Sequence, residues 1–126
     1  MRVLVCGSRT WKDYDTVYAT LALLDDPNAE IIHGAAKGAD DFAGRAAQAL
    51  GLAVEPHPAD WERYGNSAGP IRNREMIESN IDLVLAFSDK WPVQGGTAHT
   101  CRLAFEKGTP VHIVFSSWAA VGEGEG

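Results

Sequence analysis

Cysteine and histidine are scarce in this chain of 126 residues, and neither occurs in a pattern that binds metal. Cys6 and Cys101 are its two cysteines, and neither has a CxxC neighbour. Such cysteines are typical of reduced thiols that pack as small hydrophobic side chains in a cytosolic protein. The four histidines show no HxxxH spacing and form no quartet with the cysteines. We therefore expect no disulfide, no metal site and no cofactor.

Long hydrophobic runs are also missing. No apolar stretch approaches the ~18 residues that a membrane-spanning helix needs. Residues 1–5 enter a strand pattern at once, without the apolar core and cleavage site of a signal peptide. The sequence thus predicts a cytoplasmic protein that neither enters a membrane nor is secreted.

Positive charge is outnumbered. Lysine and arginine total 11 against 17 aspartates and glutamates, which gives a net charge of −6 and a pI near 5.1. Sequence-independent binding of long DNA or RNA requires a basic face, so this balance disfavours such a partner. A local basic cluster can still bind a small anion.

Short apolar runs alternate with stretches of helical periodicity along the chain. The runs have the length of strands, are rich in Val, Ile and Leu, and lie at about residues 2–6, 30–33, 52–57, 82–87 and 110–115. The stretches with helical spacing lie at about residues 14–25, 39–50, 70–80 and 97–107. Helix boundaries are expected at Asp13 or Asp15, Gly51, Pro70 and Gly108.

This alternation predicts a Rossmann-like, doubly wound α/β fold, with a parallel sheet of about five strands and helices on both faces. Five strands most simply adopt the order 3-2-1-4-5, in which ligands bind beyond the carboxyl ends of the strands, next to strand 1. The length suits one domain, which we place at residues 1–117. Residues 118–126 are small and polar, and we expect them to form a disordered tail.

Three of the apolar runs lead into glycine turns that open the next helix. The turns comprise residues 7–9, 34–40 and 95–97, and the expected strand order makes them neighbours. Glycine lets a ligand approach the backbone closely, and a new helix N-terminus offers unpaired N–H groups and a positive dipole end. Three such turns on one sheet edge predict a phosphate site, and hence a nucleotide site.

Each turn also has a purely structural interpretation. Gly38 can serve a packing contact between its turn and a neighbouring segment. Asp40 can stabilise the dipole of its helix, or it can accept a hydrogen bond from a ribose or a base. Thr97 can cap its helix, or it can donate its hydroxyl to a phosphate. The sequence leaves both interpretations open at each turn.

The segment Gly-Pro-Ile-Arg-Asn-Arg-Glu-Met places two arginines where Pro70 predicts the first turn of a helix. Positive side chains are unfavourable there, by a few tenths of a kcal/mol each. Arg72 can be balanced by Glu75 or Glu78, and Arg74 by Glu78. Alternatively, an external anion supplies the missing negative charge.

Large aromatic side chains flank the predicted site, at Trp11, Trp61, Tyr64 and Trp91. Each can stack on a base, or can instead anchor its own loop on the protein. His99 follows the third glycine turn closely enough to belong to the same site.

Four segments, taken in order, resemble one family. They are residues 7–11, 33–40, 69–76 and 96–104, which contain the glycine turns and the paired arginines. Their order is similar to that of the domain-of-unknown-function 2493 family, the YspA-like (cpYpsA-related) branch of the SLOG superfamily. That superfamily also contains the LOG phosphoribohydrolases, DprA and YpsA-type proteins. The resemblance covers about residues 1–116 and implies a Rossmann-like fold that binds nucleotides or nucleotide-derived ligands at the carboxyl ends of its strands.

The resemblance to LOG enzymes fails at one catalytic position. Their last turn reads PGGxGTxxE, and its glutamate acts with an arginine in cleaving an N-glycosidic bond. Gly96 and Thr97 match the Gly-Thr pair, but Thr100 stands at the position of the glutamate. The acid that such catalysis requires is therefore missing, unless Glu75 or Asp40 replaces it.

Our main hypothesis is binding of a nucleotide or nucleotide-derived ligand, related to ADP-ribose, NAD or a nucleoside phosphate, in a protein that can act as a sensor. The expected ligand-binding residues are Gly7, Ser8, Arg9, Gly34, Lys37, Gly38, Asp40, Arg72, Asn73, Arg74, Gly95, Gly96 and Thr97. A second hypothesis is a nucleotide N-glycosidic hydrolase, for which the candidate catalytic residues are Arg72, Asp40 and Glu75. A third is DprA-like binding of single-stranded DNA, which the net charge disfavours. The resemblance also implies that a homodimer or larger homo-oligomer can form.

Overall fold

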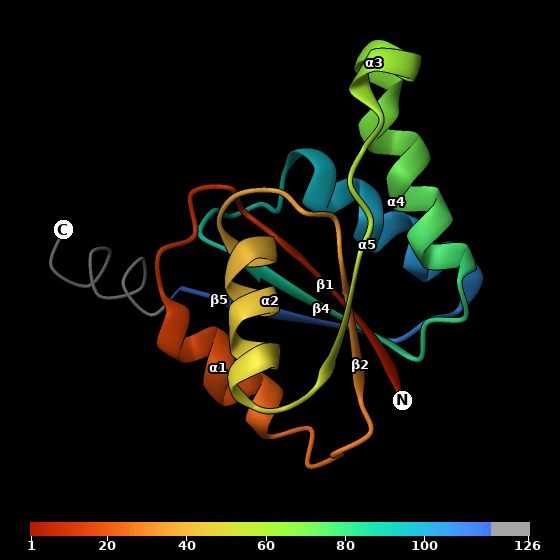
Figure 1. Ribbon diagram of the computed structural model, residues 1–126. Coiled ribbons are helices and arrows are strands. Elements are labelled where there is room, and N and C mark those ends of the chain that lie inside the picture. Colours follow the sequence, from red (N-terminus) through yellow and green to blue (C-terminus); the bar gives the residue numbers. More distant parts are fainter. Residues whose placement is uncertain (117–126) are drawn as a thin grey trace, which may run out of the picture.

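The computed structural model describes residues 1–116 and contains a five-stranded parallel sheet in the order β3-β2-β1-β4-β5 (Figure 1). The strands are β1 (Arg2–Gly7), β2 (Glu30–His33), β3 (Ala53–Pro56), β4 (Leu83–Ser88) and β5 (Val111–Phe115). Each neighbouring pair is parallel, with Val5 beside His33 on one side and beside Leu85 on the other. The expected fold class and strand order are confirmed.

Helices cover both faces of this sheet. They are α1 (Tyr14–Ala22), α2 (Ala39–Ala49), α3 (Trp61–Tyr64), α4 (Ala68–Glu78) and α5 (Gly95–Lys107). Helices α1 and α2 lie together on one face, and α4 and α5 lie together on the other (Figure 1). The short helix α3 and the 3-10 turn η1 (Gly65–Ser67) stand away from the sheet and lead directly into α4.

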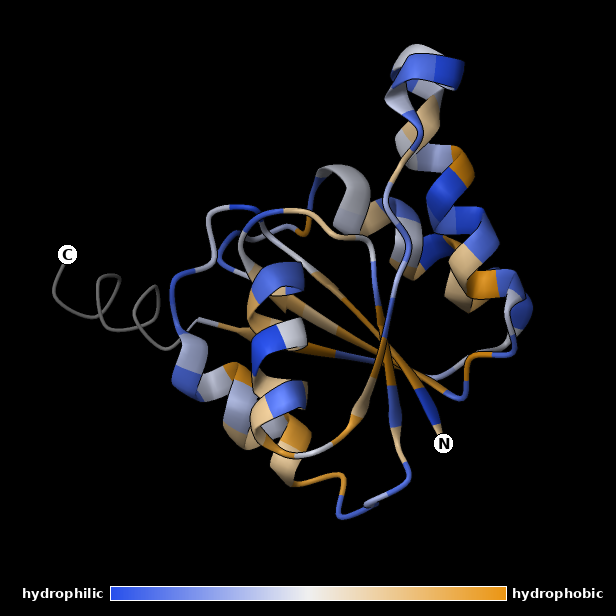
Figure 2. Ribbon diagram, in the orientation of Figure 1, coloured by the Kyte–Doolittle hydropathy of each residue, from blue (hydrophilic) through white to orange (hydrophobic). Residues whose placement is uncertain are grey.

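The hydrophobic core has two halves because alternate residues of a strand point to opposite faces. Val3 and Val5 of β1 pack in the half under α1 and α2, whereas Leu4 and Cys6 pack in the half under α4 and α5. All four are buried, as expected for strands covered on both sides. Figure 2 shows the apolar strands inside and the hydrophilic residues of the helices outside. Cys6 therefore packs as a small hydrophobic residue, as its sequence context predicted.

Helix boundaries follow the capping signals, with two exceptions. Thr97 does not cap its helix, because α5 begins at Gly95 and Thr97 lies inside it. The Asp13 side chain caps α1 by accepting from the Thr16 N–H at 3.0 Å, and Gly108 ends α5 in the left-handed conformation. The expectation that Pro70 begins its helix is wrong, because η1 runs without a break into α4 at Ala68. Proline is tolerated at the third helical position because N–H groups of the first turn need no intrahelical partner.

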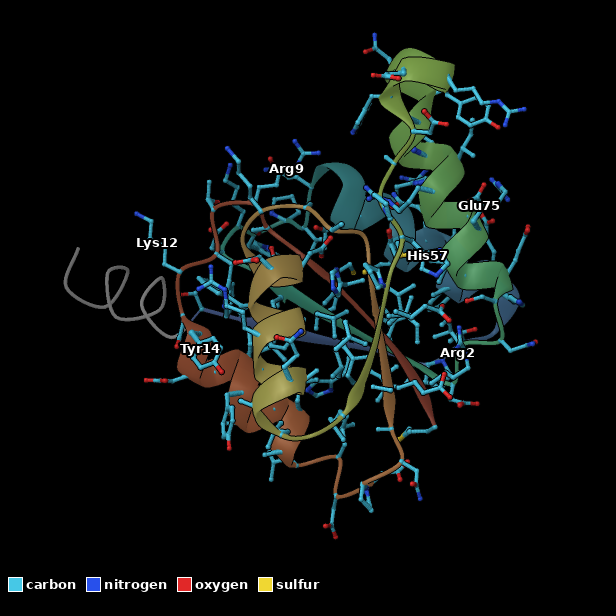
Figure 3. The ribbon with its side chains drawn as sticks, in the orientation of Figure 1. Arg2, Arg9, Lys12, Tyr14, His57 and Glu75 are labelled. Carbon is cyan, nitrogen blue, oxygen red and sulfur yellow. The ribbon has the colours of Figure 1, made fainter. Side chains whose placement is uncertain are left out.

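Charged side chains tie β1, β2 and β3 together on one side of the sheet. The Arg2 guanidinium contacts Glu30 at 2.6 Å and Glu55 at 2.9 Å, and the His57 ring contacts Glu55 at 2.7 Å. Hydrogen bonds from Arg2 and then His57 lower the pKa of the Glu55 carboxyl to about 2. Figure 3 shows Arg2 near the chain start and Arg9 at the other end of the strand.

Membrane-spanning helices and metal-binding groups can be looked for in residues 1–116. No helix in this part of the chain has both the length and the apolar character that crossing a bilayer requires. The same residues contain no group of three or more side chains that could hold a metal ion. The expected tail, residues 118–126, lies outside the described residues.

Candidate ligand-binding site

A cavity of about 390 Å³ lies at the carboxyl edge of the sheet, where the turns after β1, β2 and β4 meet. We call it the main cavity, and its walls are formed by Val5, Cys6, Gly7, Ser8, Arg9, Thr10, Ala36, Asp40, Arg72, Asn73, Met76, Lys90, Gln94, Gly95, Gly96, Thr97 and Thr100. The three glycine turns are therefore neighbours, as predicted, because parallel strands end at a common edge of the sheet.

The first turn, after β1, forms the floor of the main cavity. Gly7 packs so closely that a Cβ there would meet the Phe87 carbonyl oxygen and the Ala39 side chain. The Ser8 N–H donates to the Phe87 carbonyl at 2.8 Å, which fixes the turn to the end of β4. Arg9 is exposed at the rim and forms no ion pair within residues 1–116. Its charge is therefore available to an anion.

Asp40 organises the second turn, after β2. Its Oδ2 atom accepts from the N–H groups of Gly34 at 3.1 Å and Ala36 at 3.2 Å, so those two donors are already used. Burial raises the pKa of the Asp40 carboxyl, and the hydrogen bond from Ala36 is the largest influence against that rise. Among the described residues the Oδ1 atom has no hydrogen-bond partner.

Gly38 holds the second turn against the first. Its φ is 73°, which favours glycine, and a Cβ there would meet the carbonyl oxygens of Ser8 and Arg9, the latter at 2.5 Å. The next residue, Ala39, donates its N–H to the Ser8 carbonyl at 3.2 Å. Gly38 does not line the main cavity. Its observed contacts pack the second turn against the first, which is the structural role that the sequence left open.

Arg72 of α4 is half-buried and is surrounded by neutral acceptors. Its Nε donates to the Asn73 side-chain oxygen at 2.9 Å, and its Nη1 donates to the carbonyl oxygens of Gly34 and His57. Within residues 1–116 its Nη2 group makes no hydrogen bond, and the guanidinium forms no ion pair. Burial lowers the pKa of Arg72, with Asp40 acting against it. The expected pairing with Glu75 or Glu78 is absent from the described structure.

Gly34 separates these two charged groups. A Cβ at Gly34 would lie 2.5 Å from Arg72 Nη1 and 3.0 Å from Asp40 Oδ2. Glycine here lets a cation and a carboxylate approach the same short segment of backbone from two sides.

The third turn places the start of α5 at the main cavity. Gln94 precedes the helix and its side chain makes no capping hydrogen bond, so the first N–H groups, at Gly95, Gly96 and Thr97, have no partner from a cap. Thr97 is buried, and no hydrogen bond of its hydroxyl is found in the described part of the chain. Uncapped N–H groups and the positive end of a helix dipole favour a phosphate.

Thr100 stands where LOG enzymes carry a glutamate, and it has a structural partner. Its hydroxyl donates to the Gly96 carbonyl at 3.0 Å, and its side chain is buried at the wall of the main cavity. Asp40 is thus the one carboxylate among the residues that line this cavity.

Several predicted residues lie elsewhere. Arg74 and Glu75 are exposed on α4 and do not line the main cavity, and Figure 3 shows Glu75 well apart from Arg9. Because α4 begins at Ala68, the expectation that Arg72 and Arg74 lie in its first turn is wrong. Gly34 and Lys37 line an adjoining cavity instead.

The aromatic candidates differ in burial and in whether they line a cavity. Trp11 is only 2% exposed and packs edge-on against Phe87 at 5.5 Å, so it anchors its loop. Trp91 packs against Phe115, and Tyr64 lies under Arg63 on α3. Trp61 alone among these four candidates lines a cavity, the one that adjoins the main cavity.

His99 is connected to the main cavity through Asn73. The buried Asn73 amide contacts His99 Nδ1 at 3.2 Å, while its oxygen accepts from Arg72. Burial lowers the pKa of His99, and the charges of Arg102 and Arg74 act in the same direction. Asn73 therefore fixes the orientation of Arg72. Nothing in the sequence around Asn73 indicates this role.

Lys90 was missed by sequence reasoning. It lines the main cavity two residues beyond the end of β4, just as Arg9 lies two residues beyond the end of β1. Both positions follow a strand of the central sheet, and this spacing is the signal that could have identified Lys90. With Arg72, the lining carries three cationic side chains against the single carboxylate of Asp40, although the chain as a whole has a net charge of −6.

Fold and site together define a class: a doubly wound α/β protein with a cationic cavity at the carboxyl edge of its sheet, beside an uncapped helix N-terminus. Residues 1–64 match the YAcAr family, described as the YspA, cpYpsA-related SLOG family. The chain is also 45% identical over 118 residues to the Gene 61 protein of Mycobacterium phage D29, covering 87% of this chain and 93% of that protein. The chain therefore belongs to the YspA, cpYpsA-related SLOG family. This membership indicates a function related to nucleotides or nucleic acids.

A solved structure has the same fold. DNA processing protein A (DprA) from Streptococcus pneumoniae superposes with a TM-score of 0.73 at 23% identity, over 89% of this chain. The match covers 49% of DprA, so this chain spans about half its length. At this level of identity the likeness concerns the fold.

Proposed function

We propose that this protein binds a nucleotide or nucleotide-derived ligand, of the ADP-ribose, NAD or nucleoside phosphate kind, in the main cavity. The observation that carries the proposal is the half-buried Arg72, whose described hydrogen bonds all go to neutral acceptors while its Nη2 group has none. A partly buried cation is stabilised by an anionic partner. Asp40 forms no described ion pair with Arg72, so we expect an anion from outside the protein to complete this arrangement.

The anion of the ligand is a phosphate at the start of α5. The N–H groups of residues 95–97 have no capping side chain, and Arg9, Arg72 and Lys90 lie on the walls of the same cavity. Helix N–H groups and guanidinium groups both bind phosphate, whose several oxygens can accept from the helix N-terminus and from the arginines together.

The sugar of the ligand contacts Asp40. Its Oδ1 atom is an acceptor without a described partner on the cavity wall, and a ribose hydroxyl is the donor that would satisfy it. The Oδ2 atom meanwhile holds the second turn in place.

Binding is favoured over hydrolysis of the ligand. N-glycosidic cleavage commonly uses an acid to protonate the leaving group or to stabilise an oxocarbenium-like transition state. The lining offers one carboxylate, and one of its oxygens accepts two backbone N–H groups. We expect incubation with NAD or nucleoside monophosphates to release no free base, as chromatography will show; release that is lost in Asp40→Asn would instead support a hydrolase.

Calorimetric titration of the dialysed, full-length protein with ADP-ribose, AMP and inorganic phosphate tests the binding proposal. Arg72→Gln removes a charge-assisted hydrogen bond of about 1.5–3 kcal/mol, so its affinity should fall roughly 10- to 150-fold. Arg9→Gln should also weaken binding. The Arg9 side chain makes no described hydrogen bond or ion pair, so its loss should not unfold the protein. Arg74→Gln is the matched control, because it removes the same charge from α4 outside the cavity. No binding of any of these ligands, or equal losses in all three variants, would contradict the proposal.

A further inference from the structure

A second cavity, of about 570 Å³, adjoins the main cavity. The two share Arg9, Ala36 and Arg72 in their walls, so they meet at these residues. A ligand that fills one can therefore extend into the other between the two arginines.

The second cavity differs chemically from the first. Apart from the shared residues, its lining includes Pro58, Ala59 and Trp61, together with Lys37. Pro58, Ala59 and Trp61 form an apolar side, whereas the cationic groups lie at the junction and on the second glycine turn. A flat, uncharged ring system suits the apolar side better than a phosphate does.

Trp61 is held in place with much of its indole uncovered. The atom Cη2 would lie 3.5 Å from a Cβ built at Gly69, so the ring packs against α4 at a residue without a side chain. Its backbone begins α3, which Asp60 caps by accepting from the Arg63 N–H at 3.1 Å. The residue is nevertheless 51% exposed. A large aromatic ring that packs against α4 on one side and is open elsewhere offers a surface on which a nucleobase can stack.

Backbone strain lies at Ala35, another residue that lines the second cavity. Ala35 has a φ of 57°, and the other two non-glycine residues with positive φ in the described chain are Asp25 and Asn80, types that tolerate this conformation. The Ala35 N–H donates to His33 Nδ1 at 3.0 Å, which holds the strained residue in place. Strain of this kind is concentrated at ligand-binding positions, and here it shapes the second cavity.

We propose that the second cavity binds the nucleobase of the ligand, stacked on Trp61, while its phosphates pass between Arg9 and Arg72 into the main cavity. This inference rests on the proposed function and narrows it. The ligand then carries a nucleobase at one end and phosphate further along, as ADP-ribose does, because its two parts occupy two cavities. A sugar phosphate alone fills only the main cavity.

Three probes separate the two cavities in calorimetric titrations of the full-length protein: ribose 5-phosphate, AMP and ADP-ribose. Stacking of one base is worth about 1–3 kcal/mol, which corresponds to a 5- to 150-fold change in affinity. We expect Trp61→Ala to weaken the binding of ADP-ribose and AMP by a factor in this range and to leave ribose 5-phosphate binding unchanged. Trp61→Phe should restore most of the loss because it retains an aromatic face.

Tyr64→Ala is the matched control, since this neighbouring aromatic residue of α3 lines neither cavity. An equal effect of Trp61→Ala on ADP-ribose and ribose 5-phosphate, or no effect on either, would overturn the assignment of the base. If ribose 5-phosphate binds and ADP-ribose binds no more tightly, the inference fails and the proposed function stands. If none of the three probes binds the unaltered protein, both fail.

Discussion

Removing the Asp40 carboxylate should destabilise the protein because two backbone donors lose their acceptor. The N–H groups of Gly34 and Ala36 both donate to Oδ2 in a largely buried position. Hydrogen bonds to a charged group contribute about 1.5–3 kcal/mol each, and part of that loss is recovered where water reaches the half-exposed Ala36. Asp40→Ala should therefore lower the free energy of unfolding by about 2–4 kcal/mol.

Asp40→Asn is the matched variant. Its amide oxygen can accept both N–H groups, so the turn is kept and only the charge is lost. We expect its unfolding free energy to lie within about 1 kcal/mol of the unaltered protein at pH 7. Urea denaturation followed by circular dichroism measures both variants, and with a typical slope of ~1–3 kcal/mol per M the Ala variant should unfold at a clearly lower urea concentration.

The pH dependence provides a second readout of Asp40. Burial raises the pKa of this carboxyl, so the folded protein binds the proton more tightly than the unfolded chain. The unaltered protein should therefore gain stability relative to Asp40→Asn as the pH falls through the raised pKa toward the ordinary value of 3.8. An Ala variant that loses less than about 1 kcal/mol, or an Asn variant that loses as much as the Ala variant, would refute the role assigned to Oδ2.

Two further predictions concern other parts of the structure. Gly38→Ala should destabilise more than Gly51→Ala in thermal unfolding: both glycines have a φ of 73°, but only a Cβ at Gly38 would meet backbone carbonyls, whereas nothing lies within 4 Å at Gly51. The Gly51→Ala control should lose only about 1 kcal/mol of unfolding free energy, the cost of placing alanine at a positive φ. Equal losses in the two variants would contradict the packing role of Gly38. Titration of the Glu55 carboxyl by NMR should give a pKa of about 2. The stabilisation from its arginine and histidine partners is therefore present above a pH of about 4.5 and is lost as the pH falls toward 2. A midpoint near 4.5 would show that these ion pairs do not form in solution.

The fold could be predicted from the sequence because its signals repeat. Apolar runs of strand length alternate with helical spacing, and a right-handed parallel arrangement leaves few strand orders. The helix α3 was missed because four residues show little more than one turn of periodicity. Trp11 was placed near the site by its position after β1, but its ring folds back onto Phe87, a contact between segments that the local sequence does not specify.

The candidate site could be predicted only in part. The glycine turns and Asp40 were placed at one edge because strand ends converge. Arg72 also lines the main cavity, although the reason for choosing it, a place in the first helical turn, was wrong. Their partners could not be read from spacing: Asp40 holds the backbone of its own turn, and Arg72 donates to the Gly34 carbonyl, 38 residues away. Such contacts depend on how α4 packs against the second turn, which local pattern does not determine.

Amide chemical shifts during an ADP-ribose titration test most directly whether the carboxyl edge of the sheet binds a nucleotide-type ligand. The chain of 13.6 kDa is small enough for every backbone amide to be followed by NMR. We expect saturable shifts concentrated at residues 8–10, 36–38 and 94–97, with little change at the opposite end of the sheet around Arg2. Saturable shifts centred elsewhere on the protein, or none at millimolar ligand, would contradict the account.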